Sequence, residues 1–182
     1  ALGVASLIQG QMSSGQVGQI FPPPRSGRME WWNHPEMAGA GAMVAMGVHV
    51  TDTLRYVINQ EITEVLAMSD GNPRSRPIEQ LATLLIRFKN DTTGMIYATR
   101  RTPHPMNNLI LHGSEGRIAC YDTMDVVLTG RIEIQTGDIR RIENYEFDDI
   151  GLYVREVEAF CRAVVEDQEP DATGWDLSLI HI

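Results

Sequence analysis

His49 is the residue whose type and position point most directly to chemistry in this sequence. An imidazole changes charge near neutral pH, so it can accept the proton of a substrate hydroxyl while hydride leaves the adjacent carbon. Asp52 follows one helical step of three residues later and could orient that imidazole. The alternative is a partly buried histidine that a backbone group satisfies, and the sequence leaves both interpretations open.

Four further side chains could contact a ligand. Trp32 could stack on a sugar ring, or it could anchor its irregular arm to a neighbouring element. Arg100 and Arg101 end a predicted strand and could clamp an anionic or polyhydroxyl ligand, or could form a solvated strand end. His104 follows in a proline-rich segment. The histidines lack zinc-site spacing and no cysteine or carboxylate cluster completes a set, so we expect no metal.

Two absences limit the chemistry of this sequence. Gly39-Ala-Gly41 lacks the third glycine of a dinucleotide turn, because Val44 occupies that position, and no predicted strand precedes it. We expect these glycines to let the backbone pass close to another element. Lys89 is the only lysine and lies in a polar turn, so a buried lysine acid must come from outside this sequence.

A helix over Met43–Val57 is the element expected to position His49. Apolar residues recur along it at helical spacing, and His49 and Asp52 lie on a second, more polar face with Ala45. We predict two more helices, over Ala5–Val17 and over Tyr153–Asp167. The predicted core stripes are Met43, Met46, Val50, Leu54 and Val57 in the central helix, and Val154, Val157, Cys161 and Val164 in the last.

Between the last two helices the pattern changes to that of strands. Short turns rich in Gly, Asn and Asp separate eight candidate segments, which favours hairpins and an antiparallel sheet. The segments are Glu61–Ser69, Glu79–Lys89, Thr93–Arg101, Asn107–His112, Arg117–Tyr121, Val126–Leu128, Arg131–Thr136 and Ile139–Phe147. We therefore predict an α+β fold, a large and mostly antiparallel sheet with helices packed on one face. The other face would be available for oligomerisation.

The composition of the sequence limits the size of the domain, its possible partners and its compartment. The 182 residues include 15 basic and 24 acidic side chains, a formal charge of −9, and 43% are hydrophobic, enough for one domain with a core. The negative charge argues against nucleic acid and anionic membranes as partners, and the apolar run at Met43–Val57 is too short and too polar to span a bilayer. Cys120 and Cys161 stand alone, which fits a reducing compartment, and we expect the cytoplasm.

Both ends of the sequence look cut. The chain opens on Ala1 inside a predicted element, and Leu177–Ile182 resembles the translated end of a sequencing adapter. We expect native sequence to stop near Asp176 and give His181 no functional weight.

Five segments in order resemble the C-terminal domain of sugar oxidoreductases related to glucose–fructose oxidoreductase and inositol dehydrogenase, the Gfo/Idh/MocA family. They are Trp32–Tyr56, Leu84–Asn90, Leu111–Arg117, Tyr153–Phe160 and Glu169–Gly174. The resemblance implies a two-domain enzyme whose N-terminal Rossmann domain, absent here, binds NAD or NADP. Residues 1–20 would then be the remnant of the crossover from that domain, and residues 21–176 a substrate-binding and oligomerisation domain.

The resemblance also assigns roles. His49 matches the family histidine that looks to be the acid–base residue, and the expected substrate is a sugar or polyol. The expected substrate contacts are Trp32, Asn33, Asp52, Arg101 and His104. No residue of this sequence is expected to bind the cofactor, and a homo-oligomer is expected through the open sheet face.

Departures from the family pattern leave alternatives open. Ala45 stands where relatives usually carry an Asp four residues before the histidine, and Asn33 replaces the Arg of a Trp-Arg pair. An oxidoreductase is the first hypothesis. An NAD-dependent glycosidase or epimerase is the second, and a non-catalytic binding or assembly protein on the same scaffold is the third.

Overall fold

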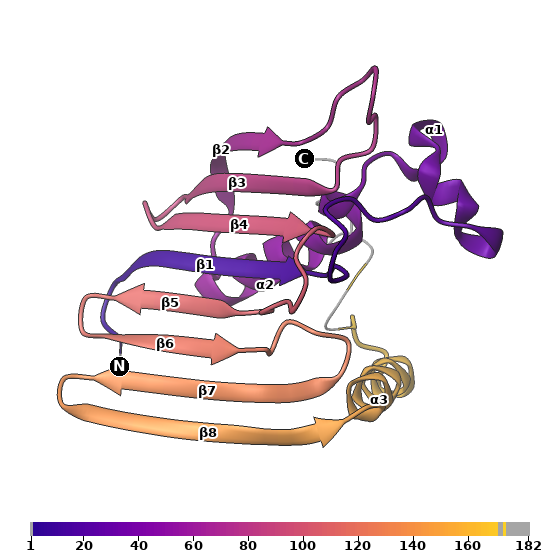
Figure 1. Cartoon of the computed structure of the whole chain (residues 1–182). Coiled ribbons are helices and arrows are strands. Elements are labelled where there is room, and N and C mark those ends of the chain that lie inside the picture. Colours follow the sequence, from indigo (N-terminus) through magenta and orange to yellow (C-terminus); the bar gives the residue numbers. More distant parts are fainter. Residues whose placement is uncertain (1, 171–172, 174–182) are drawn as a thin grey trace.

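One large sheet with a helical layer makes up this protein (Figure 1). The computed structural model describes residues 2–170 and residue 173, so the adapter-like segment 177–182 lies outside the described residues. The strands are β1 (Ala5–Ser13), β2 (Ile62–Ser69), β3 (Leu81–Phe88), β4 (Thr93–Thr99), β5 (Leu109–Gly113), β6 (Gly116–Tyr121), β7 (Leu128–Thr136) and β8 (Ile139–Asp148). The helical elements are η1 (Gly27–Asn33), α1 (Pro35–Ala38), η2 (Met43–Gly47), α2 (Val48–Ile58) and α3 (Gly151–Glu166).

The eight strands form a single sheet in the order β2-β3-β4-β1-β5-β6-β7-β8. Every neighbouring pair is antiparallel except β1 and β4, which run parallel. The predicted α+β class with a large, mostly antiparallel sheet is therefore confirmed. The two short segments expected at Val126–Leu128 and Arg131–Thr136 are one strand, β7, which begins at Leu128.

The helix predicted over Ala5–Val17 is wrong, because this segment forms the central strand β1 (Figure 1). β1 inserts between β4 and β5, so its register is set by segments far along the chain, such as Gly94 opposite Ile8. Alternate residues Ile8 and Gly10 are buried on one face, which is the period of a strand. Tertiary pairing thus overrides a local sequence with no strong strand preference.

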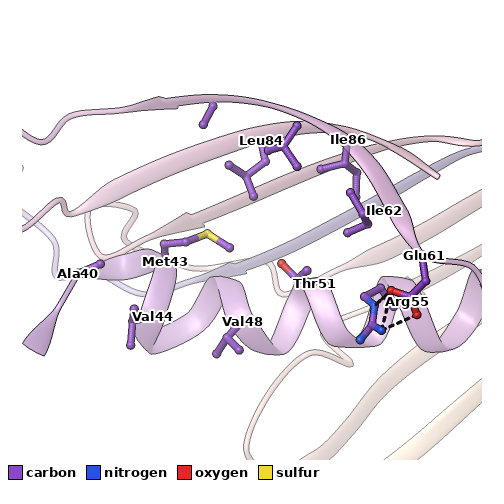
Figure 2. Close-up of a pocket in the computed structure, with 12 residues that line it drawn as sticks. Ala40, Met43, Val44, Val48, Thr51, Arg55, Glu61, Ile62, Leu84 and Ile86 are labelled. Carbon is purple, nitrogen blue, oxygen red and sulfur yellow. Dashed lines mark hydrogen bonds and ion pairs between the residues drawn. The ribbon is translucent and has the colours of Figure 1, made fainter. Parts of the chain in front are cut away.

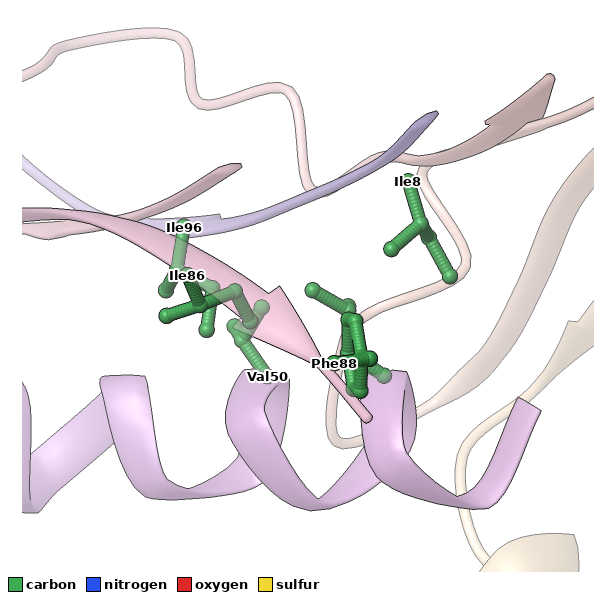
Figure 3. Close-up of a cluster of buried hydrophobic side chains, with 6 residues drawn as sticks. Ile8, Val50, Ile86, Phe88 and Ile96 are labelled. Atoms are coloured by element: carbon green, nitrogen blue, oxygen red, sulfur yellow. The ribbon is translucent and has the colours of Figure 1, made fainter. Parts of the chain in front are cut away.

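The helical layer packs on one face of the sheet through α2. Met46, Val50 and Leu54 of the predicted stripe are buried, whereas Val57 is 39% exposed at the end of the helix. Figure 3 shows Val50 reaching from α2 toward Ile86 and Ile96 of the sheet. The main core cluster consists of Ile8, Val50, Leu54, Ile86, Phe88 and Ile96.

Gly10 sets how closely α2 approaches the sheet. A Cβ atom at this position would lie 2.5 Å from Cγ1 of Val50 and 2.6 Å from Cδ1 of Leu54. Both neighbouring side chains are completely buried and have little room to move. The helix that carries His49 therefore rests directly on the backbone of β1.

α3 lies beside the end of β8 and buries little of its surface (Figure 1). The stripe expected to face the core is exposed, with Val157 at 61% and Val164 at 65%, so this part of the packing prediction is wrong for the described residues. Glu156 and Glu158 of the same helix are also exposed. No helix formed by the described residues combines the length and apolar composition that crossing a bilayer requires.

The face of the sheet opposite α2 carries an apolar ladder over β2, β3 and β4. Leu66 lies directly across from Leu85, and Leu85 lies across from Met95. All three are exposed, as is Met68 of β2 at 76%. Cross-strand neighbours of this kind form a continuous apolar surface rather than scattered residues.

A partly buried carboxylate, that of Asp70, pins the irregular arm of residues 14–34 to the sheet. Asp70 accepts hydrogen bonds from the backbone N–H groups of Gln80 (2.8 Å) and Leu81 (3.0 Å). It also forms ion pairs with Arg76 (3.2 Å) and Arg101 (2.9 Å). Their guanidinium groups lie 3.8 and 4.3 Å from the ring centre of Phe21, which holds the start of the arm.

Replacing Gly10 with Ala is expected to lower the free energy of unfolding by about 1–3 kcal/mol, because the added methyl group overpacks the interface with α2. Urea denaturation measures the change. Gln9→Ala is the matched control, since Gln9 is the adjacent residue of β1 and points to the opposite face, and it should shift stability by no more than about 0.5 kcal/mol. Equal stability of Gly10→Ala and the wild type would contradict the close approach.

Asp70→Asn is expected to destabilise the protein at pH 7 by about 1–3 kcal/mol, because it leaves two partly buried guanidinium groups without their anion. Burial acts to raise the pKa of Asp70, but the hydrogen bonds from Gln80, Leu81 and Arg101 outweigh it and hold the pKa below its ordinary value. This stabilisation is therefore present above the unfolded pKa of about 3.9 and is lost as the pH falls through the folded value.

The stability difference between wild type and Asp70→Asn should accordingly shrink below about pH 4, as measured by urea titrations across pH. Asp138→Asn, in the exposed turn between β7 and β8, is the control and should leave stability nearly unchanged. A difference that stays constant down to pH 3 would rule out a charge effect at Asp70.

Candidate functional site

His49 lies exposed on the first turn of α2 and lines a hollow of about 260 Å³. Met12 of β1, Thr53 of α2 and the loop between β6 and β7 form the other walls. The imidazole makes no hydrogen bond with any residue that the structure describes. The side-chain hydroxyl of Thr53 donates to the backbone carbonyl of His49, not to its ring. The alternative of a buried histidine satisfied by a backbone group therefore does not apply.

The loop of residues 122–127 faces His49 across this hollow and is held by asparagines. The side chain of Asn107 donates to Oδ2 of Asp125 (3.3 Å), and its own Oδ1 accepts from the backbone N–H of Ser13 (2.8 Å). Oδ1 of Asn108 accepts from the backbone N–H of Asp122 (2.9 Å). These contacts place the carboxylate of Asp125 in the wall of the hollow that contains His49.

Asn107 and Asp125 were not predicted as site residues. Asn107 is only 6% exposed, and its amide links β1 to the loop. Two adjacent asparagines before a strand are a signal for side-chain bonds to nearby backbone, and that signal could have identified the segment. Nothing local indicates that Asp125 shares a hollow with His49, because α2 and the loop of residues 122–127 are far apart in the sequence.

The residues expected to assist His49 have other surroundings. Oδ1 of Asp52 lies 4.0 Å from Nη1 of Arg55, one helical step away, and Asp52 does not line the hollow. Arg55 in turn forms an ion pair with Glu61 at 2.7 Å. Ala45 carries no carboxylate, and its methyl group packs against the cluster of Ala42, Met46 and Ala98.

Trp32 and Asn33 lie on the arm and line a different hollow of about 230 Å³. The side chain of Asn33 accepts a hydrogen bond from the backbone N–H of Arg25 and donates one to its carbonyl, at 2.9 and 2.6 Å, which closes a loop of the arm. The ring of Trp32 contacts the ring of Trp31, with centres 4.6 Å apart, and the guanidinium of Arg25 at 4.7 Å. These contacts use ring surface that stacking on a sugar would need.

Arg101 and His104 line neither the hollow of His49 nor the hollow of Trp32 and Asn33. Arg101 donates to Asp70 and to the carbonyl of Ile20, so its guanidinium fastens the arm. His104 is exposed in a loop and adopts a left-handed backbone conformation with φ of 53°. The structure thus separates the predicted site residues into the surroundings of α2, the arm and an exposed loop.

A third hollow, of about 340 Å³, lies between α2 and the strands β2 and β3 (Figure 2). Its walls are mainly apolar, with Met43, Val48 and Ile86 among them. The ion pair between Arg55 and Glu61 closes one end. Both charged groups are paired with each other, so this groove offers apolar contact rather than proton transfer.

The glycine turn before η2 holds a carboxylate of the protein itself. The N–H groups of Gly41 and Met43 donate to Glu79, at 2.7 and 2.9 Å, and a Cβ atom on Gly41 would lie 1.8 Å from the carbonyl oxygen of Glu79. The expected close backbone approach is confirmed at Gly41 but not at Gly39, where a Cβ atom would meet nothing within 4 Å. Because Glu79 occupies the amides that a phosphate would need, the turn does not fit a dinucleotide.

Metal ligands do not gather within the part of the chain that the structure describes. No group of three or more His, Cys, Asp or Glu side chains there is arranged to hold an ion.

The sequence matches that of known sugar and polyol enzymes over most of its length. The family model of the GFO/IDH/MocA C-terminal domain matches residues 8–119. The chain is 25% identical over 160 residues to 1,5-anhydro-D-fructose reductase of Ensifer adhaerens, covering 86% of this chain and 46% of that protein. It is 28% identical over 145 residues to myo-inositol 2-dehydrogenase of Thermotoga maritima, covering 75% of this chain and 42% of that protein.

Solved structures share the fold. Aldose-aldose oxidoreductase from Caulobacter crescentus superimposes with a TM-score of 0.79 at 16% identity, over 98% of this chain and 52% of that one. Levoglucosan dehydrogenase in complex with NADH gives a TM-score of 0.75 at 20% identity, over 97% of this chain and 54% of that one. The chain spans about half the length of these relatives. Together with the match over residues 8–119, this shows that the chain belongs to the GFO/IDH/MocA family and corresponds to its C-terminal domain.

Proposed function

We propose that this chain is the substrate-binding part of an NAD(P)-dependent oxidoreductase that acts on a sugar, polyol or related hydroxyl or carbonyl compound. Residues 21–176 form that part in this proposal, and His49 is its acid–base residue. The observation that carries the proposal is the exposed imidazole of His49 in a walled hollow, in a chain of the GFO/IDH/MocA family.

The hollow around His49 has the chemistry that a polyhydroxyl ligand requires. Met12 and Met124 supply apolar surface for the C–H groups of a sugar ring. Asp125 already accepts one bond on each carboxylate oxygen, from Val126 N–H and from Asn107, and a carboxylate has further acceptor sites for ligand hydroxyls. Such a ligand would lie with a hydroxyl group toward the imidazole.

His49 handles the proton in this proposal. The neutral imidazole accepts the proton of the substrate hydroxyl as that carbon is oxidised, and the imidazolium returns it to the carbonyl oxygen in the reductive direction. Its exposure lets the proton pass on to water. In this proposal a domain outside this sequence binds the nicotinamide, and the glycine turn of this chain, which Glu79 fills, takes no part in that binding.

A homo-oligomer formed through the open sheet face is the second part of the proposal. The ladder of Leu66, Leu85 and Met95 lies exposed on the face opposite α2. Burying it against the same surface of another copy would remove apolar area from water on both sides. A cytoplasmic location completes the proposal, supported by the free thiols of Cys120 and Cys161.

A non-catalytic role is the competing candidate, and Ala45 favours it, since relatives usually carry an Asp there. Assays of the full-length protein with NAD or NADP and a panel of sugars separate the candidates. Reduction of the nicotinamide supports the oxidoreductase. Product without net reduction supports a glycosidase or epimerase, and neither outcome supports a binding protein. If Ala45→Asp increases turnover, the missing carboxylate limits the wild type.

His49→Ala is expected to lower kcat of the full-length protein by about 10²–10⁴-fold, because it removes the proton acceptor. Its stability should change by no more than about 0.5 kcal/mol, since the side chain is exposed. Steady-state kinetics and urea denaturation measure both. Tyr56→Ala is the control on the same helix, because Tyr56 is 85% exposed and lies outside the hollow. Unchanged turnover in His49→Ala would remove His49 from the mechanism.

Replacing Leu66 and Met68 together with Lys is expected to convert the oligomer to a smaller species, because the charges would have to be buried in the interface. Analytical ultracentrifugation measures the mass. Val165→Lys is the control, as Val165 is 85% exposed on α3, away from the open sheet face. A monomeric wild type, or a double variant with the mass of the wild type, would exclude this face as the interface.

A further inference from the structure

The hollow beneath the arm gathers positive charge on a chain whose formal net charge is −9. Arg76 and Arg100 line it, together with Trp32 and the three prolines that follow Phe21. Arg25 lies over the ring of Trp32, with its guanidinium carbon 4.7 Å from the ring centre. The arm, the connection between β2 and β3, and the residue after β4 all contribute to its walls.

The arginines of this region differ in whether a carboxylate balances them. Arg76 and Arg101 share Asp70, at 3.2 and 2.9 Å. Arg100 donates to the side-chain oxygen of Gln80 at 3.2 Å, and it pairs with no carboxylate among the described residues. The same holds for Arg25, which contacts Trp32 instead.

The carboxylate of Glu79, whose sequence neighbours Ile78 and Gln80 line the hollow, does not pair with these arginines. Glu79 gives both of its oxygens to the N–H groups of Gly41 and Met43. Burial, and then the charge of Arg25, lower the pKa of Arg100. A partly buried guanidinium without a carboxylate partner leaves a positive potential in the hollow, and an anion beside Arg100 would offset it.

We propose that this hollow binds the anionic group of a small ligand, a phosphate or a carboxylate, against Arg100, which lines it, and near Arg25, which lies over the ring of the lining residue Trp32. The planar guanidinium fork matches both groups and can bind either one through paired hydrogen bonds. A volume of about 230 Å³ accommodates such a group with part of the molecule that carries it. Trp32 and Asn33 then hold the arm over the ligand rather than stacking on a sugar.

This site is separate from the hollow of His49, because no residue lines both. Binding here can therefore be measured without turnover. Failure of the acid–base proposal leaves this inference intact, and failure here leaves the role of His49 intact.

Isothermal titration calorimetry of the 182-residue chain at low salt tests the proposal. The probes are inorganic phosphate, glucose 6-phosphate, glucuronate and uncharged glucose. We expect saturable binding of at least one anionic probe, no binding of glucose at this site, and weaker binding in about 0.5 M NaCl because salt screens the charges. The tighter of glucose 6-phosphate and glucuronate identifies whether a phosphate or a carboxylate is the preferred group.

Arg100→Gln and Arg25→Gln should each raise the dissociation constant of the best probe about tenfold or more, because each removes a charge-assisted contact. Arg162→Gln, on exposed α3, is the matched control and should leave it unchanged. Arg25 lies on the arm and outside the core, so its variant keeps the test valid if Arg100→Gln unfolds. Absence of saturable binding by all three anionic probes, or equal weakening in Arg162→Gln, would overturn the proposal.

Discussion

The close approach of α2 to the backbone of β1 is the contact on which the rest of the structure depends. Gly10 makes it possible because it has no side chain between the helix and the sheet. Three residues later, the backbone of Ser13 fixes Asn107, which in turn fixes the loop that carries Asp125. β1 therefore sets the position of His49 relative to the opposite wall of its hollow.

The local part of the fold follows from the sequence. Short turns join β3 to β4, β5 to β6 and β7 to β8, so alternation of side chains and turn residues was enough to predict the strands from β2 to β8. The errors were a few residues at strand ends and the division of β7 into two segments. β1 was missed because both of its partners lie far along the chain, and its own sequence mixes Ser, Gln and Gly. The apolar stripe of α3 is exposed among the described residues. An amphipathic pattern therefore predicts an apolar helix face but does not identify the surface on which that face packs.

The candidate site was predictable only where helical spacing determined it. His49 follows from the residue type and from the polar face of its helix. Asp52, the partner expected for His49, lies beside Arg55 instead. His49 and Arg55 each lie three residues from Asp52 on the helix, so spacing alone does not decide which of them Asp52 contacts. Arg100 and Arg101 are adjacent in sequence, yet Asp70 neutralises only one of them, and no local pattern distinguishes the two.

The place of β1 in the sheet also constrains how the chain is made. Among the strands of this sheet β1 is synthesised first, yet the strands that flank it, β4 and β5, are synthesised much later. Until then both edges of β1 lack the strands that pair with them. Long-range pairing of this kind slows folding and prolongs the time for which strand edges stay exposed.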